Sequence, residues 1–352
     1  MVIIIVAILL GLFTCLPLQK ASFPNSLFVL GQYALYTFIT IVVSKILAMA
    51  AHFISNCLGI RRPGYVALIV AAIAFGVMWW GAIVTPGKIE VKEVVLAFER
   101  LPDAFDGYRI VQWSDAHLGT YNGRTSIVER QIQTINDLHP DMICFTGDLV
   151  NRKTDEALPY RDLLASLHAP DGVYSVLGNH DYDNYVRWDH EQDKMADRKA
   201  LCDLQEEAGW RLLNDDYTLI KRGDDQIVII GTENYGERPF DKRGNLARAY
   251  GGLNDSHFKI QLQHNPYAWR ASTLTNSNID LMLSGHTHAW QILLKFGDWQ
   301  WSPASLRYPE WGGAYNEGDR WLYVNIGTGM VGTPMRIGAT PEITVITLKK
   351  SP

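Results

Sequence analysis

The sequence predicts an α/β protein built as a four-layer sandwich, in which two mixed β-sheets pack face to face between outer helices. Short strand patterns alternate with helical patterns early in residues 88–352, and later strand patterns follow one another directly. Residues 1–87, by contrast, contain neither Asp nor Glu and consist mostly of long apolar runs. We therefore predict a transmembrane anchor at residues 1–87 and one α/β domain at residues 88–352.

Three uncharged runs in the anchor are each long enough to cross the core of a bilayer, which requires about 20 apolar residues. They predict two or three spanning helices, at residues 2–18, 27–55 and 64–85. The first run has the length of a secretory signal peptide, but it lacks a basic start and a small-x-small cleavage site. Pro86 and Gly87 end the last predicted helix and begin a linker.

The basic residues around the spans predict the side of the membrane on which the α/β domain lies. Arg61 and Arg62 form the densest basic pair, and the positive-inside rule places their loop in the cytoplasm. The next helix would then carry the α/β domain to the external side. Lys88, Lys92 and Arg100 follow that helix and favour the opposite orientation. On balance, we predict the external side.

The elements of the α/β domain are predicted from residue type and apolar spacing. Runs rich in β-branched residues predict strands at residues 109–114, 142–146, 173–177, 217–221, 227–232, 258–263, 280–284, 321–326 and 342–348. Apolar residues at helical spacing predict helices at residues 125–138, 157–168, 193–208 and 267–275. The sequence contains no internal repeat and no low-complexity segment.

Five polar segments each follow an apolar run that ends in a turn, where a sheet presents side chains to a ligand. They are Asp115-Ala-His117, Gly147-Asp148, Gly178-Asn179-His180-Asp181, His264 and Gly285-His286-Thr287-His288. Each segment alone has an ordinary structural explanation, because an isolated His-x-His is usually a surface or core feature and Asn-His-Asp can cap a helix. Five such segments in one consistent strand-to-loop context predict a single site.

The residue types in these segments suit a pair of divalent cations. Two cations about 3.5–4 Å apart can hold a phosphoryl group and activate water, and they need a bridging carboxylate with oxygen and imidazole ligands. The candidate ligands are the carboxylates Asp115 and Asp148, the imidazoles His117, His264, His286 and His288, and the amide of Asn179. Two carboxylates leave such a site net positive, which suits an anionic substrate. The four cysteines lack the spacing of a structural zinc site.

The combined pattern D-x-H, G-D, G-N-H-D, H and G-H-x-H resembles the calcineurin-like metallophosphoesterase superfamily. The stretch from Gly327 to Val345 resembles the membrane-anchored bacterial phosphodiesterases of that superfamily. The resemblance implies one cation held by Asp115, His117, Asp148 and His288, and a second held by Asp148, Asn179, His264 and His286. Asp148 would bridge the two cations, which would be Mn, Fe or Zn, because this ligand set accepts all three.

The resemblance also assigns roles to residues beside the metal ligands. His180 would donate a proton to the leaving-group oxygen or stabilise its charge, and Asp181 would orient His180. This chain departs from the usual pattern after the second His of G-H-x-H, where relatives carry two glycines and this sequence has Ala289 and Trp290. We therefore expect a bulkier rim around the pocket.

Several residues outside the motifs are candidates for binding the substrate. Arg238 and Arg243, in the loop 233–254, could hold a phosphate or headgroup, or could simply face solvent. Arg152 could reach a substrate oxygen or form a surface ion pair. The aromatic residues of the segment 297–321 could form a pocket wall, touch the membrane interface or pack in the core.

Charge excludes one class of partner. The whole chain carries a formal charge of −5 and residues 1–87 contribute +4, so residues 88–352 carry −9. Recognition of nucleic acid usually rests on a basic surface, so we expect no nucleic-acid partner. The predicted partners are the bilayer and a phosphoester substrate, and the sequence does not predict the oligomeric state.

These observations predict a two-metal phosphohydrolase anchored in the bacterial cytoplasmic membrane and acting on a phosphodiester or pyrophosphate. The anchor is compatible with a lipid-linked substrate without requiring one. One alternative is a pyrophosphatase of the lipid A type, which splits a nucleotide-linked acyl sugar. A second alternative is a non-catalytic membrane scaffold, for which a missing ligand would be expected, whereas every expected ligand is present.

Overall fold

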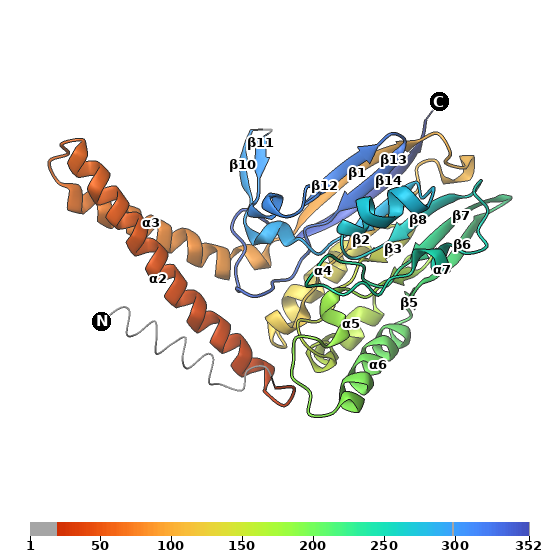
Figure 1. The fold of residues 1–352 in the computed structure, drawn as a ribbon, viewed down its shortest axis with the longest axis horizontal. Helices are drawn as coiled ribbons and strands as arrows, with labels where there is room; N and C mark the ends of the chain where they lie inside the picture. The colour runs from red at the N-terminus through yellow and green to blue at the C-terminus, as the bar shows by residue number, and fades with distance from the viewer. Residues whose placement is uncertain (1–19, 298, 352) are drawn as a thin grey trace.

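Two long antiparallel helices project from an α/β domain (Figure 1). The computed structural model describes residues 20–297 and 299–351. Helix α2 spans Asn25–Cys57 and helix α3 spans Pro63–Ile83, which confirms two of the predicted apolar helices. Pro63 occupies the first position of α3, where its missing N–H costs no helical hydrogen bond. The predicted span at residues 2–18 lies outside the described residues.

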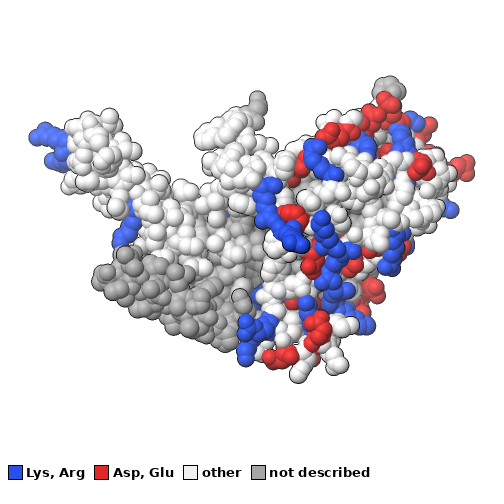
Figure 2. Space-filling model, viewed as in Figure 1, with Lys and Arg blue, Asp and Glu red and all other residues white. Residues whose placement is uncertain are grey.

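Both helices are long and apolar enough to cross a membrane. Within the described residues, most of their large apolar side chains are exposed, whereas a core helix of a water-soluble domain would bury them. Figure 2 shows the helix pair as mostly uncharged, while acidic and basic side chains crowd the α/β domain. These features indicate that the protein is associated with a membrane.

Two six-stranded mixed sheets form the centre of the domain. The first runs in the order β1-β14-β2-β3-β4-β5 and the second in the order β12-β13-β9-β8-β7-β6. The first contains β1 (Glu90–Phe98), β2 (Arg109–Trp113), β3 (Met142–Phe145), β4 (Val173–Ser175), β5 (Arg211–Leu212) and β14 (Glu342–Lys350). The second contains β6 (Asp216–Arg222), β7 (Asp225–Gly231), β8 (Phe258–Leu262), β9 (Leu281–Ser284), β12 (Gly313–Glu317) and β13 (Arg320–Val324). A separate hairpin is formed by β10 (Leu294–Phe296) and β11 (Trp299–Trp301).

The sheets and helices make four layers because successive strand residues point to opposite faces. In β3, Ile143 and Phe145 join the core beneath the helices, whereas Met142 and Cys144 join the core between the sheets. The first sheet is covered by α4 (Thr125–Asp137), α5 (Arg161–Ala165) and α6 (Glu191–Glu207). The second is covered by α7 (Leu246–Tyr250) and the segment that includes α8 (Leu274–Asn276). The predicted fold class is confirmed.

All nine predicted strands are present, and the differences lie in short or half-exposed elements. Strand β1 was not predicted, because three of its first four residues are charged and most of the strand is only partly covered. The predicted helix 157–168 is reduced to α5, since Pro159 interrupts the segment before Arg161. The predicted helix 267–275 forms a π-helical turn at Trp269–Thr273 and then α8.

The helix pair is bonded to the α/β domain through polar contacts at its near end. The Gln32 side chain of α2 donates to the carbonyl of Gly332 at 2.9 Å. Near the end of α3, the backbone N–H of Arg336 donates to the carbonyl of Gly81 at 2.8 Å. A Cβ added at Gly81 would lie 2.9 Å from the Arg336 carbonyl oxygen, so only glycine permits this approach.

Replacing Gly81 by Ala should therefore destabilise the protein, because the new methyl group must push α3 away from the domain. We expect a loss of about 1–3 kcal/mol, measured by thermal unfolding of the full chain in nanodiscs. Gly76→Ala is the matched control, since the same helix offers open space at Gly76. Equal melting temperatures for the two variants would contradict the close approach of α3.

Candidate metal centre

The polar segments predicted from the sequence meet at the carboxyl ends of parallel strands from both sheets. Asp115 and His117 follow β2, and Asp148 follows β3. The Asn179–Asp181 turn follows β4, His264 follows β8, and the His286–His288 turn follows β9. Because β2, β3 and β4 are parallel neighbours, as are β8 and β9, their carboxyl ends present these residues to one location.

Four of the seven candidate ligands form one buried group. Asp115, His117, Asp148 and His288 each offer a ligand atom, and these atoms lie within 4.8 Å of one another. The Nε2 atoms of His117 and His288 are 3.1 Å apart. His288 Nε2 also lies 3.1 Å from Asp115 Oδ1, and His117 Nε2 lies 3.5 Å from Asp148 Oδ2. This is the set that the resemblance implies for the first cation.

The other candidate ligands gather around His264. Its Nε2 atom lies 3.2 Å from Asp148 Oδ2, 3.2 Å from Asn179 Oδ1 and 3.3 Å from His286 Nδ1. Asp148 Oδ2 therefore faces an imidazole nitrogen of each group, which is the position expected of a bridging carboxylate. All seven residues predicted as ligands come together in the structure.

Glycines in the motifs make room for the two carboxylates. A Cβ added at Gly178 would lie 2.1 Å from Asp148 Oδ1, and one added at Gly285 would lie 2.1 Å from Asp115 Oδ2. Neither position could hold a larger residue without displacing a candidate ligand. Asp115, Asp148 and other residues of the centre have positive φ angles, a conformation that non-glycine residues adopt at a cost and that is typical of functional sites.

Hydrogen bonds at the outer ring nitrogens aim the inner nitrogens of two histidines into the centre. His264 Nδ1 donates to the Thr146 carbonyl at 2.8 Å, so a neutral ring leaves the Nε2 lone pair facing Asp148. His286 Nε2 lies 2.9 Å from the Tyr308 hydroxyl, which leaves Nδ1 facing His264. Such outer contacts are what orient histidines that bind metal.

The electrostatics of the centre favour a bound cation. Burial lowers the pKa of His117 well below its ordinary value, and burial with the neighbouring His264 lowers the pKa of His286 to about 3. Burial would also lower the pKa of His264, but the Asp148 carboxylate raises it to about 9. Between Asp148 and His264, a positive charge is strongly stabilised. Neutral imidazoles, carboxylates and an amide oxygen are suitable ligands for a divalent metal, so the residues fit the predicted cofactor.

His180 lies beside the centre with its ring orientation fixed. Its Nδ1 donates to the Asn151 carbonyl at 2.6 Å, and its ring stacks on Tyr185 with centroids 3.8 Å apart. Asp181, which we expected to orient this ring, has a different set of contacts. Its carboxylate accepts hydrogen bonds from the backbone N–H groups of Asp148, Leu149, Val150 and Gly178. Asp181 therefore positions the Asp148 loop, and the orienting contact to His180 comes from Asn151.

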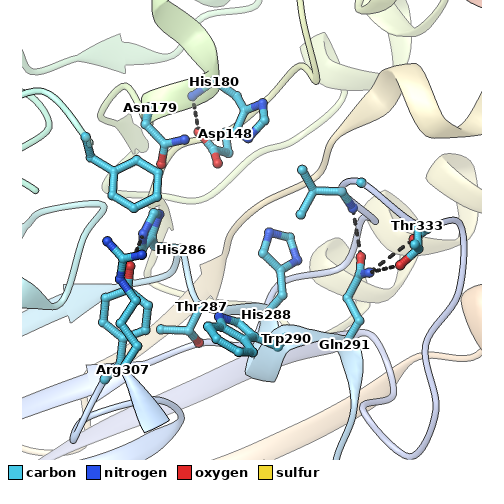
Figure 3. Close-up of a pocket in the computed structure, with 14 residues that line it drawn as sticks. Asp148, Asn179, His180, His286, Thr287, His288, Trp290, Gln291, Arg307 and Thr333 are labelled. Atoms are coloured by element: carbon cyan, nitrogen blue, oxygen red, sulfur yellow. Dashed lines mark hydrogen bonds between the residues drawn. The ribbon is translucent and has the colours of Figure 1, made fainter. Parts of the chain in front are cut away.

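An open cavity of about 390 Å³ lies over the centre. Figure 3 shows Asp148, Asn179 and His180 on one side of it, facing His286 and His288. Its lining consists of Asp148, Asn179, His180, Phe240, His286, Thr287, His288, Trp290, Gln291, Arg307, Tyr308, Val331, Gly332 and Thr333. A cavity of this size with convergent polar groups can admit a phosphoester headgroup.

The arginines predicted to bind substrate do not line this cavity. Arg152 is buried, donates to Glu156 at 3.2 Å and lies over the Phe28 ring of α2. Arg243 pairs with Asp241, and Arg238 contributes its backbone carbonyl to Arg307. The local sequence indicated only that these residues are cationic and near a motif. The direction of each side chain depends on the residues it contacts in the fold, which the local sequence does not reveal.

Among the described residues, Arg307 is the arginine that lines the cavity, and the sequence analysis did not identify it. Its Nε donates to Glu237 at 2.8 Å, and its guanidinium lies 5.4 Å from the Phe240 ring centroid. Tyr308, one of the aromatic candidates for a pocket wall, lines the cavity beside it. The sequence signal that could have indicated Arg307 is its place beside Tyr308 and Trp311, in the aromatic-rich segment after G-H-T-H.

The expected bulky rim is present at Trp290, which lines the cavity. Ala289 and Trp290 have φ angles of 50° and 44°, so both keep a backbone conformation that favours glycine. The conformation explains why glycines are suited to these positions. In this chain Trp290 lies on the cavity wall and is exposed, while Ala289 is buried.

Arg336 is a second residue that the sequence analysis did not single out. It is fully buried, and its Nη2 lies 3.1 Å from His288 Nδ1 and 3.0 Å from the Ile326 carbonyl. Its Nε donates to the Gly329 carbonyl at 2.8 Å. Arg336 thus holds His288 from behind while its backbone bonds to α3.

Comparisons with known proteins agree with this geometry. Residues 108–290 match the family model of the calcineurin-like phosphoesterases. The Bacillus subtilis metallophosphoesterase YkuE is 36% identical over 76% of this chain and 87% of its own length. A Danio rerio transmembrane protein with a metallophosphoesterase domain is 29% identical over 83% of this chain and 64% of its own length. The Chlamydia trachomatis UDP-2,3-diacylglucosamine pyrophosphatase LpxG is 29% identical over 63% of this chain and 78% of its own length.

Proposed function

The chain belongs to the calcineurin-like phosphoesterase family and is a phosphoesterase, and we propose that it is a two-metal phosphodiesterase of the bacterial cytoplasmic membrane. The observation that carries this proposal is the position of Asp148 Oδ2 between two groups of ligand atoms. It lies 3.5 Å from His117 Nε2 in one group and 3.2 Å from His264 Nε2 in the other. One carboxylate oxygen shared in this way suits a pair of cations better than a single one.

We assign the first cation to Asp115, His117, Asp148 and His288, and the second to Asp148, Asn179, His264 and His286. When bound, Mn, Fe or Zn would supply positive charge for the phosphoryl oxygens and lower the pKa of the attacking water. The protein residues would fix the phosphoryl group between the two groups of ligands. The cavity above them leaves room for an ester group on either side of the phosphorus.

His180 is assigned to the leaving group. Its Nδ1 proton is held by the Asn151 carbonyl, so in the protonated ring the remaining N–H belongs to Nε2. His180 also lines the cavity, and it is therefore placed to donate that proton to the departing oxygen. Stacking against Tyr185 keeps the ring in one orientation, which reduces the reorganisation needed in the reaction.

A second candidate function is hydrolysis of the pyrophosphate of a nucleotide-linked acyl sugar. The similarity to the Chlamydia trachomatis pyrophosphatase LpxG favours it. Both reactions place water on phosphorus between the same ligands, so the centre alone does not separate them. Product mass after incubation with UDP-2,3-diacylglucosamine distinguishes them, since the pyrophosphatase releases UMP and the acyl-sugar phosphate.

The α/β domain is assigned to the external side of the membrane. Arg61 and Arg62 lie in the loop between α2 and α3, at the end of the helix pair that is far from the domain (Figure 1). If that loop is cytoplasmic, as the positive-inside rule favours, the domain lies on the other side.

The proposed function predicts metal-dependent hydrolysis of bis-p-nitrophenyl phosphate that depends on Asp148. Asp148→Asn keeps the size of the side chain but weakens the shared ligand, so we expect less bound metal and a rate below about one-hundredth of wild type. Metal content by mass spectrometry and nitrophenolate release measure the two effects. The surface variant Asp203→Asn, which removes only an exposed pair with Lys199, should retain both. A wild-type chain inactive with Mn, Fe and Zn would refute the proposal, as would a fully active Asp148→Asn.

The role of His180 predicts a dependence on the leaving group. His180→Ala should lower kcat for diphenyl phosphate by about 10²–10⁴, because phenolate departs poorly without a proton. The loss on bis-p-nitrophenyl phosphate should be far smaller, since nitrophenolate leaves unaided. Bound metal, measured in parallel, should be unchanged. Equal losses on the two substrates would argue against proton donation.

The orientation predicts which cysteine reacts with a membrane-impermeant maleimide in spheroplasts. Cys57 is exposed at the end of α2 next to the Arg61 loop and should be protected until the membrane is opened. An exposed position on α6 of the domain, Met195→Cys, should react in intact spheroplasts. For labelling at Cys57, Cys15 and Cys202 are replaced by Ser. For labelling at Met195→Cys, Cys57 is replaced by Ser as well, so that each site is tested alone. The reverse labelling pattern would place the domain in the cytoplasm.

A further inference from the structure

The hairpin of β10 and β11 exposes large apolar side chains outside both main sheets. Phe296 is 71% exposed and Trp299 is 55% exposed, and the two rings face each other across the strands with centroids 5.8 Å apart. Leu294 is also exposed on the same ribbon. Within the described residues, no strand of either six-stranded sheet pairs with this hairpin. A two-stranded ribbon is marginally stable in water by itself, so its apolar surface calls for a partner.

The base of the hairpin is continuous with the membrane anchor. Ile292, which precedes β10, packs in one apolar cluster with Tyr36 of α2, Ala82 of α3 and Met335. Figure 1 shows the hairpin projecting from the domain beside the end of α3. The segment that carries the exposed aromatic residues therefore starts where the anchor meets the domain.

The lengths of the helices locate the bilayer surface. Helix α2 has 33 residues, about 50 Å at 1.5 Å per residue, which exceeds a bilayer core of about 30 Å. Its first turns are bonded to the domain through Asn25 and Gln32. The remainder after Tyr36, residues 37–57, is as long as the 21 residues of α3. The bilayer surface nearest the domain thus lies near the level of Tyr36.

Aromatic residues of α3 mark the same level. The ring of Trp79 contacts Tyr36 at a centroid distance of 5.9 Å, and Lys88 lies 5.3 Å from the ring of Trp80. Trp is enriched where a spanning helix passes through the headgroup region, and Lys favours the aqueous side of that region. The hairpin begins at this level through the contacts of Ile292, so its exposed aromatic residues are suited to the same interface.

Two walls of the catalytic cavity are connected to the hairpin and to the anchor. Trp290, on the cavity wall, stands four residues before β10 and is itself partly exposed. On another wall lies Gly332, whose carbonyl accepts the hydrogen bond from Gln32 of α2. These two walls therefore connect the cavity to the segments that lie nearest the bilayer.

We propose that the β10–β11 hairpin inserts its aromatic side chains into the bilayer interface and holds the cavity at the lipid surface. The substrate class is then a phosphoester of a membrane lipid whose acyl chains stay in the bilayer while the headgroup reaches the metal centre. Hydrolysis adds water to phosphorus and breaks one P–O ester bond, leaving a lipid phosphate or a lipid alcohol in the membrane. This substrate class rests on the proposed phosphodiesterase function, whereas the membrane contact of the hairpin does not.

Nitroxide accessibility tests the membrane contact directly. The full chain in nanodiscs carries one nitroxide at Phe296→Cys, with Cys15, Cys57 and Cys202 replaced by Ser. We expect collisions with oxygen to exceed those with an aqueous nickel chelate, as for a site within lipid. The matched control is Met195→Cys on α6, which is 66% exposed and should behave as an aqueous site. Equal accessibility at both positions would overturn the proposal, and so would spin coupling between two copies, which would assign the hairpin to a dimer contact.

Two substrates with the same leaving group test the consequence for catalysis. Dioleoyl-phosphatidyl-p-nitrophenol in the nanodisc and soluble bis-p-nitrophenyl phosphate both release nitrophenolate. The double variant Phe296→Asp, Trp299→Asp should lower kcat/KM for the lipid about tenfold or more, because the contacts of both aromatic side chains with the bilayer are lost. Its rate on the soluble ester should be unchanged, which also shows that the variant is folded, and Met195→Asp should change neither.

The outcomes separate the two proposals. Equal rates of the double variant and wild type on the lipid substrate would overturn the role of the hairpin. A parallel loss on both substrates would also overturn it, since the effect would then be on the catalytic domain itself. If the wild-type chain hydrolysed neither ester, the proposed phosphodiesterase function would instead be refuted, and the accessibility result would stand unchanged.

Discussion

The carboxylate of Asp148 is the constraint around which the catalytic domain is arranged. It is almost fully buried, its Oδ1 accepts the backbone N–H of His180 at 2.8 Å, and its Oδ2 faces imidazoles from both sheets. A buried negative charge of this kind requires nearby positive charge, and a protonated His264 or a metal cation can supply it. Asp181 secures the loop by binding its backbone N–H groups, and Gly178 leaves the space that the carboxylate occupies. The two sheets are thereby joined at one functional point.

The buried strands could be predicted from the sequence because their apolar residues do not depend on a particular neighbour. Strand β3 is an example, since every residue of Met142–Phe145 is buried. Strand β1 was not recognised, because it lies at a sheet edge and three of its first four residues are charged. The β10–β11 hairpin was missed for a related reason: three-residue strands with exposed aromatic side chains lack the pattern of a buried sheet.

Seven candidate ligands could be selected from motifs, since glycine, carboxylate and histidine spacing is constrained by the geometry of the centre itself. Residues that act through distant contacts carry no such local pattern. Asn151 orients His180 with a backbone carbonyl, which any residue type possesses. Arg307 reaches the cavity only because Glu237 and Phe240 come from another loop, and Arg152 turns instead toward Glu156 and α2. Side-chain direction, not residue type, separated the arginine that lines the cavity from those that do not.

Arg336 links the helix pair to the metal centre through hydrogen bonds at both its backbone and its side chain. Its backbone N–H donates to the carbonyl of Gly81 in α3, and its guanidinium contacts His288. A change at α3, whether from a change in bilayer thickness or from cutting the chain before the domain, can therefore reach the candidate metal ligand His288. Only two hydrogen bonds, both made by Arg336, lie between them. The environment of the helix pair is therefore coupled, through Arg336, to the position of His288 in the metal centre.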